Sequence, residues 1–101
     1  MEVANQDELS DGSCCILALI QSGKLTVANL GDSICTLVKK DRSWQKLSSD
    51  HSPARADEKD RVLKSHGTII RGKVQGELAV TRAFGNRELK DIIISKPEIL
   101  Q

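Results

Sequence analysis

Apolar and polar residues alternate along residues 24–37, KLTVANLGDSICTL, on both sides of a Gly31-Asp32-Ser33 triplet. This alternation is typical of two half-buried strands joined by a tight turn. Glycine tolerates a positive φ, and aspartate and serine bond their own backbone, so the triplet favours a turn. The pattern therefore predicts a β-hairpin over residues 24–37 with Asp32 at its tip.

Three further segments predict strands around this hairpin. Residues 14–20, CCILALI, form a continuous apolar run that is typical of a strand buried on both faces. Residues 43–48 would pair as another strand, and residues 97–100, PEIL, can only form an edge or terminal strand because of the proline. Residues 78–84, LAVTRAF, fit a strand or a helical turn equally well by periodicity.

One helix is expected after Pro53, over residues 55–65. Acidic residues lie early in this segment and Lys64 lies late, which complements the helix dipole, and Gly67 is placed for a left-handed C-terminal cap. The apolar face is thin, so the helix should lie on a surface, with Glu58 and Arg61 as a solvent-exposed pair. Residues 68–78 then predict an irregular loop with two short strand fragments.

Length and composition set the class of the protein. A chain of 101 residues with 39% hydrophobic residues builds about one small domain, which we place at residues 12–101 after a polar, flexible lead-in at residues 1–11. The net charge of +1 and the presence of only two aromatic residues, Trp44 and Phe84, argue against nucleic-acid and membrane partners. The sequence has neither a signal peptide nor an apolar span, so we expect a soluble cytoplasmic or nuclear protein.

The three cysteines give no disulfide framework and no zinc pattern. Cys14 and Cys15 are adjacent in a predicted strand and would point to opposite faces, and no CxxC motif is present. We therefore expect buried, reduced thiols. His51, in a loop before Pro53, is interpreted as a residue that bonds the backbone rather than as an acid or base.

Asp32 has two interpretations. Aspartate is common in turns for conformational reasons alone. A carboxylate held at the end of a sheet is also suited to binding a metal ion, because it need not be ordered again when the ion arrives.

Several motifs together resemble the central part of the type 2C (PPM-type) metal-dependent serine/threonine protein phosphatases. In chain order they are GSCCILALI, VANLGDS, LSSDHSP, E58KDR61, VQGELAVTRAFGN with Lys90 following, and PEI. Their order and spacing extend from about Asp11 to the end of the chain.

The resemblance implies an α+β fold that is part of a two-layer antiparallel β-sandwich flanked by helices. It implies that Asp32 and Asn86 lie at positions of metal ligands, that residues 56–76 border the active site, and that magnesium or manganese is the cofactor. Two such ions would activate a water for attack on the phosphorus of phosphoserine or phosphothreonine in a phosphoprotein substrate. No residue of this chain is proposed as a nucleophile or other catalytic group.

The chain departs from the family pattern in ways that matter for activity. The upstream segment with Asp-Gly-His-Gly-Gly and the downstream Asp-Asn motif are absent, and an amide at Asn86 adds no charge to a metal site. Asn86 can also be a turn residue, and Arg82 can bind phosphate or form a structural ion pair. We therefore expect a phosphatase fragment that binds metal weakly or not at all and is inactive alone, with exposed sheet that needs the missing part of the domain or a partner. The alternative is a catalytically inactive phosphatase-like binding or regulatory module.

Overall fold

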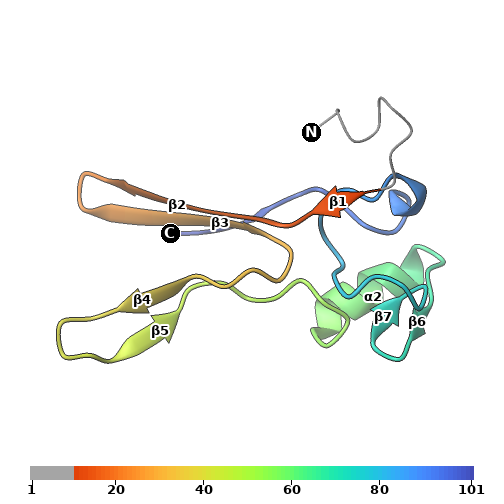
Figure 1. Cartoon of the computed structure of the whole chain (residues 1–101), viewed down its shortest axis with the longest axis horizontal. Helices are drawn as coiled ribbons and strands as arrows, with labels where there is room; N and C mark the ends of the chain where they lie inside the picture. The colour runs from red at the N-terminus through yellow and green to blue at the C-terminus, as the bar shows by residue number, and fades with distance from the viewer. Residues whose placement is uncertain (1–10) are drawn as a thin grey trace.

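The computed structural model describes residues 11–101, and two β-ribbons lie alongside one another with the helix at one end (Figure 1). The secondary structure in chain order is β1 (Gly12–Ser13), β2 (Cys15–Gln21), β3 (Lys24–Leu30), β4 (Thr36–Val38), β5 (Trp44–Lys46), α2 (Ala56–Lys64), β6 (Ile69–Ile70), β7 (Lys73–Val74), β8 (Phe84–Gly85), the 3₁₀ helix η1 (Arg87–Leu89) and β9 (Glu98–Leu100). Within residues 11–101, no helix has the length and apolar content needed to cross a bilayer.

All strand pairings between these elements are antiparallel. The longest ribbon has the order β2-β3-β9, with Cys15 opposite Leu30 and Asn29 opposite Glu98. The second ribbon pairs β4 with β5, and two short pairs join β1 to β8 and β6 to β7. The predicted strand after residue 43, the two fragments of the 68–78 loop and the terminal strand are therefore confirmed.

The predicted hairpin over residues 24–37 is wrong. The hairpin in this region joins β2 to β3, and its turn is Ser22-Gly23, where both residues have positive φ, 52° and 76°. Two consecutive positive φ values match the right-handed twist of an antiparallel pair, which is why this turn closes the hairpin. Asp32 therefore follows the end of a strand instead of forming a hairpin tip.

The backbone around Gly31 bonds to the loop that contains His51 instead of to a neighbouring strand. The Gly31 amide donates to His51 Nδ1 at 2.9 Å, and the His51 amide donates to the Gly31 carbonyl at 3.0 Å. Further along, the Cys35 amide donates to Ser48 Oγ at 3.0 Å. These bonds turn the chain out of the first ribbon and into the second.

Strand β2 is less buried than its apolar run predicts. Leu17, Leu19 and Ile20 are 63%, 57% and 78% exposed, although the run was expected to be buried on both faces. The reason is that β2 is an edge strand with nothing packed over much of either face among residues 11–101. The expectation that this sheet presents apolar surface to water is met.

Helix α2 confirms the predicted helix, but its C-terminal cap is at a different residue. His66 has the left-handed conformation, with φ 65°, where Gly67 was expected to have it. The amide of His66 donates to the Leu63 carbonyl and that of Gly67 to the Val62 carbonyl, which is the Schellman arrangement. Gly67 has a packing role, because a Cβ there would lie 2.9 Å from both Val62 Cγ1 and Ile92 Cγ2.

The core lies beside α2 and under the 80–93 segment. Its buried apolar members are Val62, Val74, Val80, Ala83, Ile92 and Ile93. Residues 78–84, for which strand and helical turn were both open, form neither as a whole. They pair through β8 and through isolated bridges of Leu78 with Val74 and of Arg82 with Ile94. The predicted lead-in at residues 1–11 lies outside the described residues except for Asp11, whose carbonyl accepts from the Asn86 amide at 2.9 Å.

Candidate functional site

Asp32 lies just beyond the end of β3, with its side chain exposed to solvent. Its Oδ1 is 3.6 Å from the Cys14 sulfur, which donates to it. Burial raises the pKa of the Cys14 thiol, so the sulfur stays protonated at neutral pH and can act as the donor. The predicted ligand position is thus an accessible carboxylate that has one side-chain hydrogen-bond partner among residues 11–101.

Asn86 lies at the start of η1 in the left-handed conformation, with φ 48° and ψ 51°. Asparagine is one of the few residues other than glycine that adopts this conformation readily. Its side-chain amide lies against the backbone of Gly12, at the place that a Cβ of residue 12 would take. Asp32 and Asn86 therefore approach the two ends of one short segment, residues 12–14, which contains β1.

The oxygen donors near this segment do not make up a complete metal site. A hard divalent ion is usually held by several carboxylate and carbonyl oxygens. Across residues 11–101 there is no group of three or more His, Cys, Asp or Glu side chains that could hold an ion. Asp32 and Asn86 contribute one full charge and one amide oxygen, so they could supply only part of the binuclear centre that the resemblance implies.

His51 is fully buried, and it ties the Asp32 loop to the rest of the fold. Its Nδ1 accepts from Gly31, its carbonyl accepts from the Thr81 amide at 2.8 Å, and its Nε2 lies 3.4 Å from Glu98 Oε1. Burial first, and the charge of Arg82 second, lower the pKa of His51. The interpretation of His51 as a backbone-bonding residue agrees with these contacts.

Glu58 forms a buried hydrogen-bonded network, so its assignment to a solvent-exposed pair with Arg61 is wrong. The side chain is 1% exposed and accepts from Thr81 Oγ1 at 2.6 Å and from Arg61 at 2.8 Å. Arg82 binds both of its oxygens, at 3.0 and 2.9 Å, so Arg82 forms the structural ion pair that had been left open. Burial opposes ionisation of Glu58, but hydrogen bonds from Arg82, Thr81 and Arg61 outweigh it and lower the pKa to about 2.

A second charged cluster fixes the start of α2. Arg55 binds Glu98 of β9 through Nη1 and Nη2, at 2.9 and 2.8 Å, and it binds Asp57 through Nε and the same Nη2, at 2.7 and 2.9 Å. These bonds lower the pKa of the Glu98 carboxyl, with the Arg55 hydrogen bonds as the largest cause. Sequence reasoning did not find this cluster, because Arg55 and Glu98 lie 43 residues apart along the chain.

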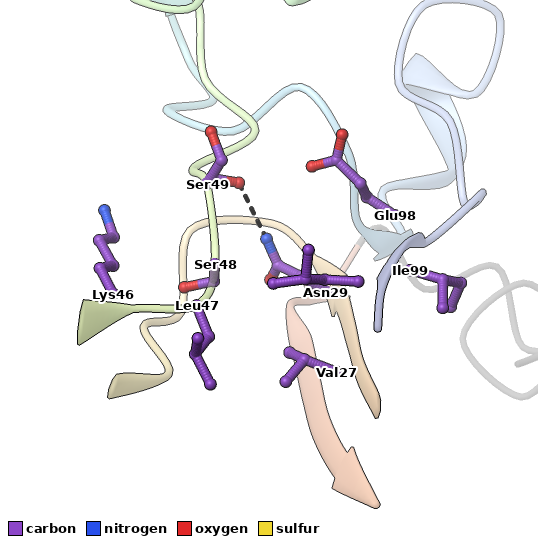
Figure 2. A pocket seen from close by; sticks show the side chains of 9 residues that line it. Val27, Asn29, Lys46, Leu47, Ser48, Ser49, Glu98 and Ile99 are labelled. Carbon is purple, nitrogen blue, oxygen red and sulfur yellow. Dashed lines mark hydrogen bonds between the residues drawn. The ribbon is translucent and has the colours of Figure 1, made fainter. Parts of the chain in front are cut away.

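A cavity of about 350 Å³ separates the two ribbons (Figure 2). Asn29 of β3 is 3% exposed there and donates to the Ser49 carbonyl at 3.0 Å, while its Oδ1 has no donor among residues 11–101. Both ribbons contribute to the walls, which are lined by Val27, Asn29, Lys46, Leu47, Ser48, Ser49, Glu98, Ile99 and Leu100.

Comparison with known sequences identifies the family that the chain resembles. The family model described as Protein phosphatase 2C matches residues 1–101. The Arabidopsis thaliana "Probable protein phosphatase 2C 2" is 42% identical over 103 residues, covering 97% of this chain and 27% of that protein. The Oryza sativa "Probable protein phosphatase 2C member 13, mitochondrial" is 42% identical over 92 residues, covering 88% of this chain and 25% of that protein.

Solved structures agree with the sequence relatives. A Caenorhabditis elegans sex determining protein matches with a TM-score of 0.86 and 28% identity over 97% of this chain and 25% of that chain. A Toxoplasma gondii phosphatase matches with a TM-score of 0.70 and 32% identity over 74% of this chain and 26% of that chain. The chain thus spans about a quarter of these relatives, and the predicted fold, an incomplete PPM-type antiparallel sandwich with helices, is confirmed. On the family match and on these relatives together, the chain belongs to the protein phosphatase 2C family.

Proposed function

We propose that this chain is the central part of the catalytic domain of a metal-dependent phosphatase that hydrolyses phosphoserine and phosphothreonine in proteins. The family match supports this proposal, and the relatives extend well beyond the matched region. Magnesium or manganese is the proposed cofactor, with most of its ligands supplied by other parts of the domain. Asp32 and Asn86 are the proposed contributions of this chain.

The observation that carries the proposal is that Asp32 and Asn86 both approach the short segment at residues 12–14. Cys14 donates to Asp32 at 3.6 Å, and the Asn86 amide group lies against Gly12. Residues 54 positions apart in the sequence thereby lie beside one segment of backbone. A carboxylate and an amide held beside one paired segment of backbone could supply part of an oxygen-rich site without further ordering.

The remaining residues of the network have a supporting role in this proposal. His51 holds the backbone of Gly31, directly before Asp32, and Thr81 connects His51 to the Glu58 cluster. Burial of these bonds keeps the loop rigid, since breaking any of them would leave a buried polar group unpaired. These bonds thus fix the backbone directly before Asp32.

A chimera tests the proposal directly. The 103 matched residues of the Arabidopsis relative would be replaced by this chain, and hydrolysis of a phosphothreonine peptide would be measured with Mn²⁺ beside the unmodified relative. The proposal predicts Mn²⁺-dependent turnover by the folded chimera. A chimera that folds, confirmed by circular dichroism, yet has no activity while the relative turns over would refute the proposal.

That same outcome would favour the alternative function, a phosphatase-like module that binds partners without turnover. The amide side chain of Asn86 favours this alternative, because an amide brings no negative charge to a metal site. Adding Asn86→Asp to the chimera separates the two. Restored activity would mean that the asparagine alone had removed catalysis from an otherwise competent site.

A further inference from the structure

The thiol of Cys14 lies beside the carboxylate that the proposed function needs. Among residues 11–101, Cys14 is the only side chain that hydrogen-bonds to Asp32, with sulfur and Oδ1 3.6 Å apart. A thiol is a weak donor, so the bond contributes mainly to the orientation of the carboxylate. The other oxygen of Asp32 has no side-chain donor among those residues, which leaves it available for a ligand.

The position of the sulfur is fixed by a glycine. Gly31 has a φ of 111°, and a Cβ at this residue would overlap the Cys14 sulfur and Cβ. The missing side chain of Gly31 therefore provides the space that the thiol fills, directly before Asp32. A bulkier residue at position 31 would displace the sulfur from the carboxylate.

The backbone of Cys14 is held from both sides. The preceding strand β1 pairs with β8, with Ser13 opposite Phe84, and the following strand β2 pairs with β3, with Cys15 opposite Leu30. Cys14 also packs against the apolar core. The thiol thus presents a donor from a backbone position held by both strand pairs, next to the exposed side chain of Asp32.

We propose that Cys14 is a positioning residue for Asp32, holding Oδ1 so that the second carboxylate oxygen faces the site. This inference rests on the proposed function, since the orientation of Asp32 matters only if its carboxylate binds a ligand. The inference requires a hydrogen-bond donor at position 14. Cys14→Ser should therefore preserve the orientation of Asp32, whereas Cys14→Ala should not.

The contact itself can be tested in the 101-residue chain by infrared spectroscopy of the S–H stretch. A hydrogen-bonded thiol absorbs at lower frequency than a free one, and Cys14→Ala identifies the band by removing it. We expect Asp32→Ala to shift that band to higher frequency, and Cys15→Ala, the matched control, to leave it unchanged. A Cys14 band that does not move in Asp32→Ala would overturn the inference.

The consequence can be tested in the chimera through the Mn²⁺ concentration that gives half-maximal activity. Loss of one weak hydrogen bond predicts a roughly two- to fivefold increase in Cys14→Ala. Cys14→Ser should stay within about twofold of the parent chimera and Cys15→Ala should match it. The positioning role would be contradicted if Cys14→Ala and the parent chimera needed the same Mn²⁺ concentration for half-maximal activity. It would also be contradicted if Cys14→Ser were as impaired as Cys14→Ala. Both results would leave the proposed function intact. An inactive parent chimera would instead contradict the proposed function, and the infrared result would still decide the contact.

Discussion

Replacing Glu58 by glutamine should lower the free energy of unfolding by about 3 kcal/mol at neutral pH. The side chain is 1% exposed, and its pKa falls from the ordinary value of 4.5 to about 2. That difference corresponds to about 3 kcal/mol of preference for the ionised carboxylate in the folded state. Removal of one partner of a buried ion pair costs about 3 to 5 kcal/mol in other proteins, which agrees in magnitude.

The contribution of Glu58 to the free energy of unfolding should also depend on pH in a defined direction. Because the folded-state pKa of Glu58 is depressed, its stabilisation is fully present above pH 4.5 and is lost as the pH falls through about 2. Glutamine does not titrate, so the difference between the wild type and the variant should shrink as the pH falls below 4.5.

Urea unfolding followed by far-UV circular dichroism at several pH values would measure both effects. Glu77→Gln is a matched control, since Glu77 is exposed and has no ion pair within residues 11–101. The control should change the unfolding free energy by less than about 0.5 kcal/mol. A Glu58→Gln variant that unfolds within that same margin of the wild type at neutral pH would refute the account of the buried network.

Three further outcomes follow from the packing and from the exposed strand. Gly67→Ala should cost about 1 to 3 kcal/mol, because its Cβ would lie 2.9 Å from Val62 and Ile92, and an unchanged urea midpoint would count against this close packing. The pKa of His51 is lowered in the folded protein, so the unfolded chain binds the proton more tightly. The free energy of unfolding should therefore decrease as the pH falls below 6.5, and it should decrease less in His51→Gln. Parallel pH profiles of the two proteins would contradict this prediction. Leu19 is 57% exposed, so Leu19→Thr should change the free energy of unfolding by less than about 0.5 kcal/mol and should reduce self-association in analytical ultracentrifugation. If the wild type self-associates and the variant has the same sedimentation profile, the exposed face of β2 does not mediate the association.

The helix and the short strands could be predicted because their causes are local. Pro53 sets the start of the helix region, and the glycines at 72 and 76 divide the following loop into fragments, as observed. The hairpin was misplaced because Gly31-Asp32-Ser33 has the residue types of a tight turn and has alternating apolar residues on both sides. Only the consecutive positive φ values at Ser22 and Gly23 decide which one closes the ribbon.

The buried charges could not be predicted from spacing alone. Glu58 and Arg61 are three residues apart, and such pairs are usually solvent-exposed. The partners that bury Glu58, Thr81 and Arg82, are 23 and 24 residues further along the chain. One signal was present in the sequence, since Glu58 lies four residues before Val62 and therefore on the same helix face as the buried valine.

The candidate site was predicted only through the family motifs. Composition gave no reason to connect Asp32 with Asn86. The segment that both approach, residues 12–14, contains only the two-residue strand β1 and has no periodic signature. The contact between Asp32 and Cys14 was also not predicted, because it depends on the missing side chain of Gly31. Such fits between a glycine and a neighbouring side chain leave no pattern in a single sequence.

The central claim, that this chain contributes a ligand carboxylate to a phosphatase site, is tested most directly by the Mn²⁺ dependence of the chimera. The concentration of Mn²⁺ that gives half-maximal hydrolysis would be compared between the parent chimera and Asp32→Ala. The account predicts an increase of about tenfold or more in the variant, with the fold retained by circular dichroism. Equal Mn²⁺ midpoints for the two proteins would contradict the claim.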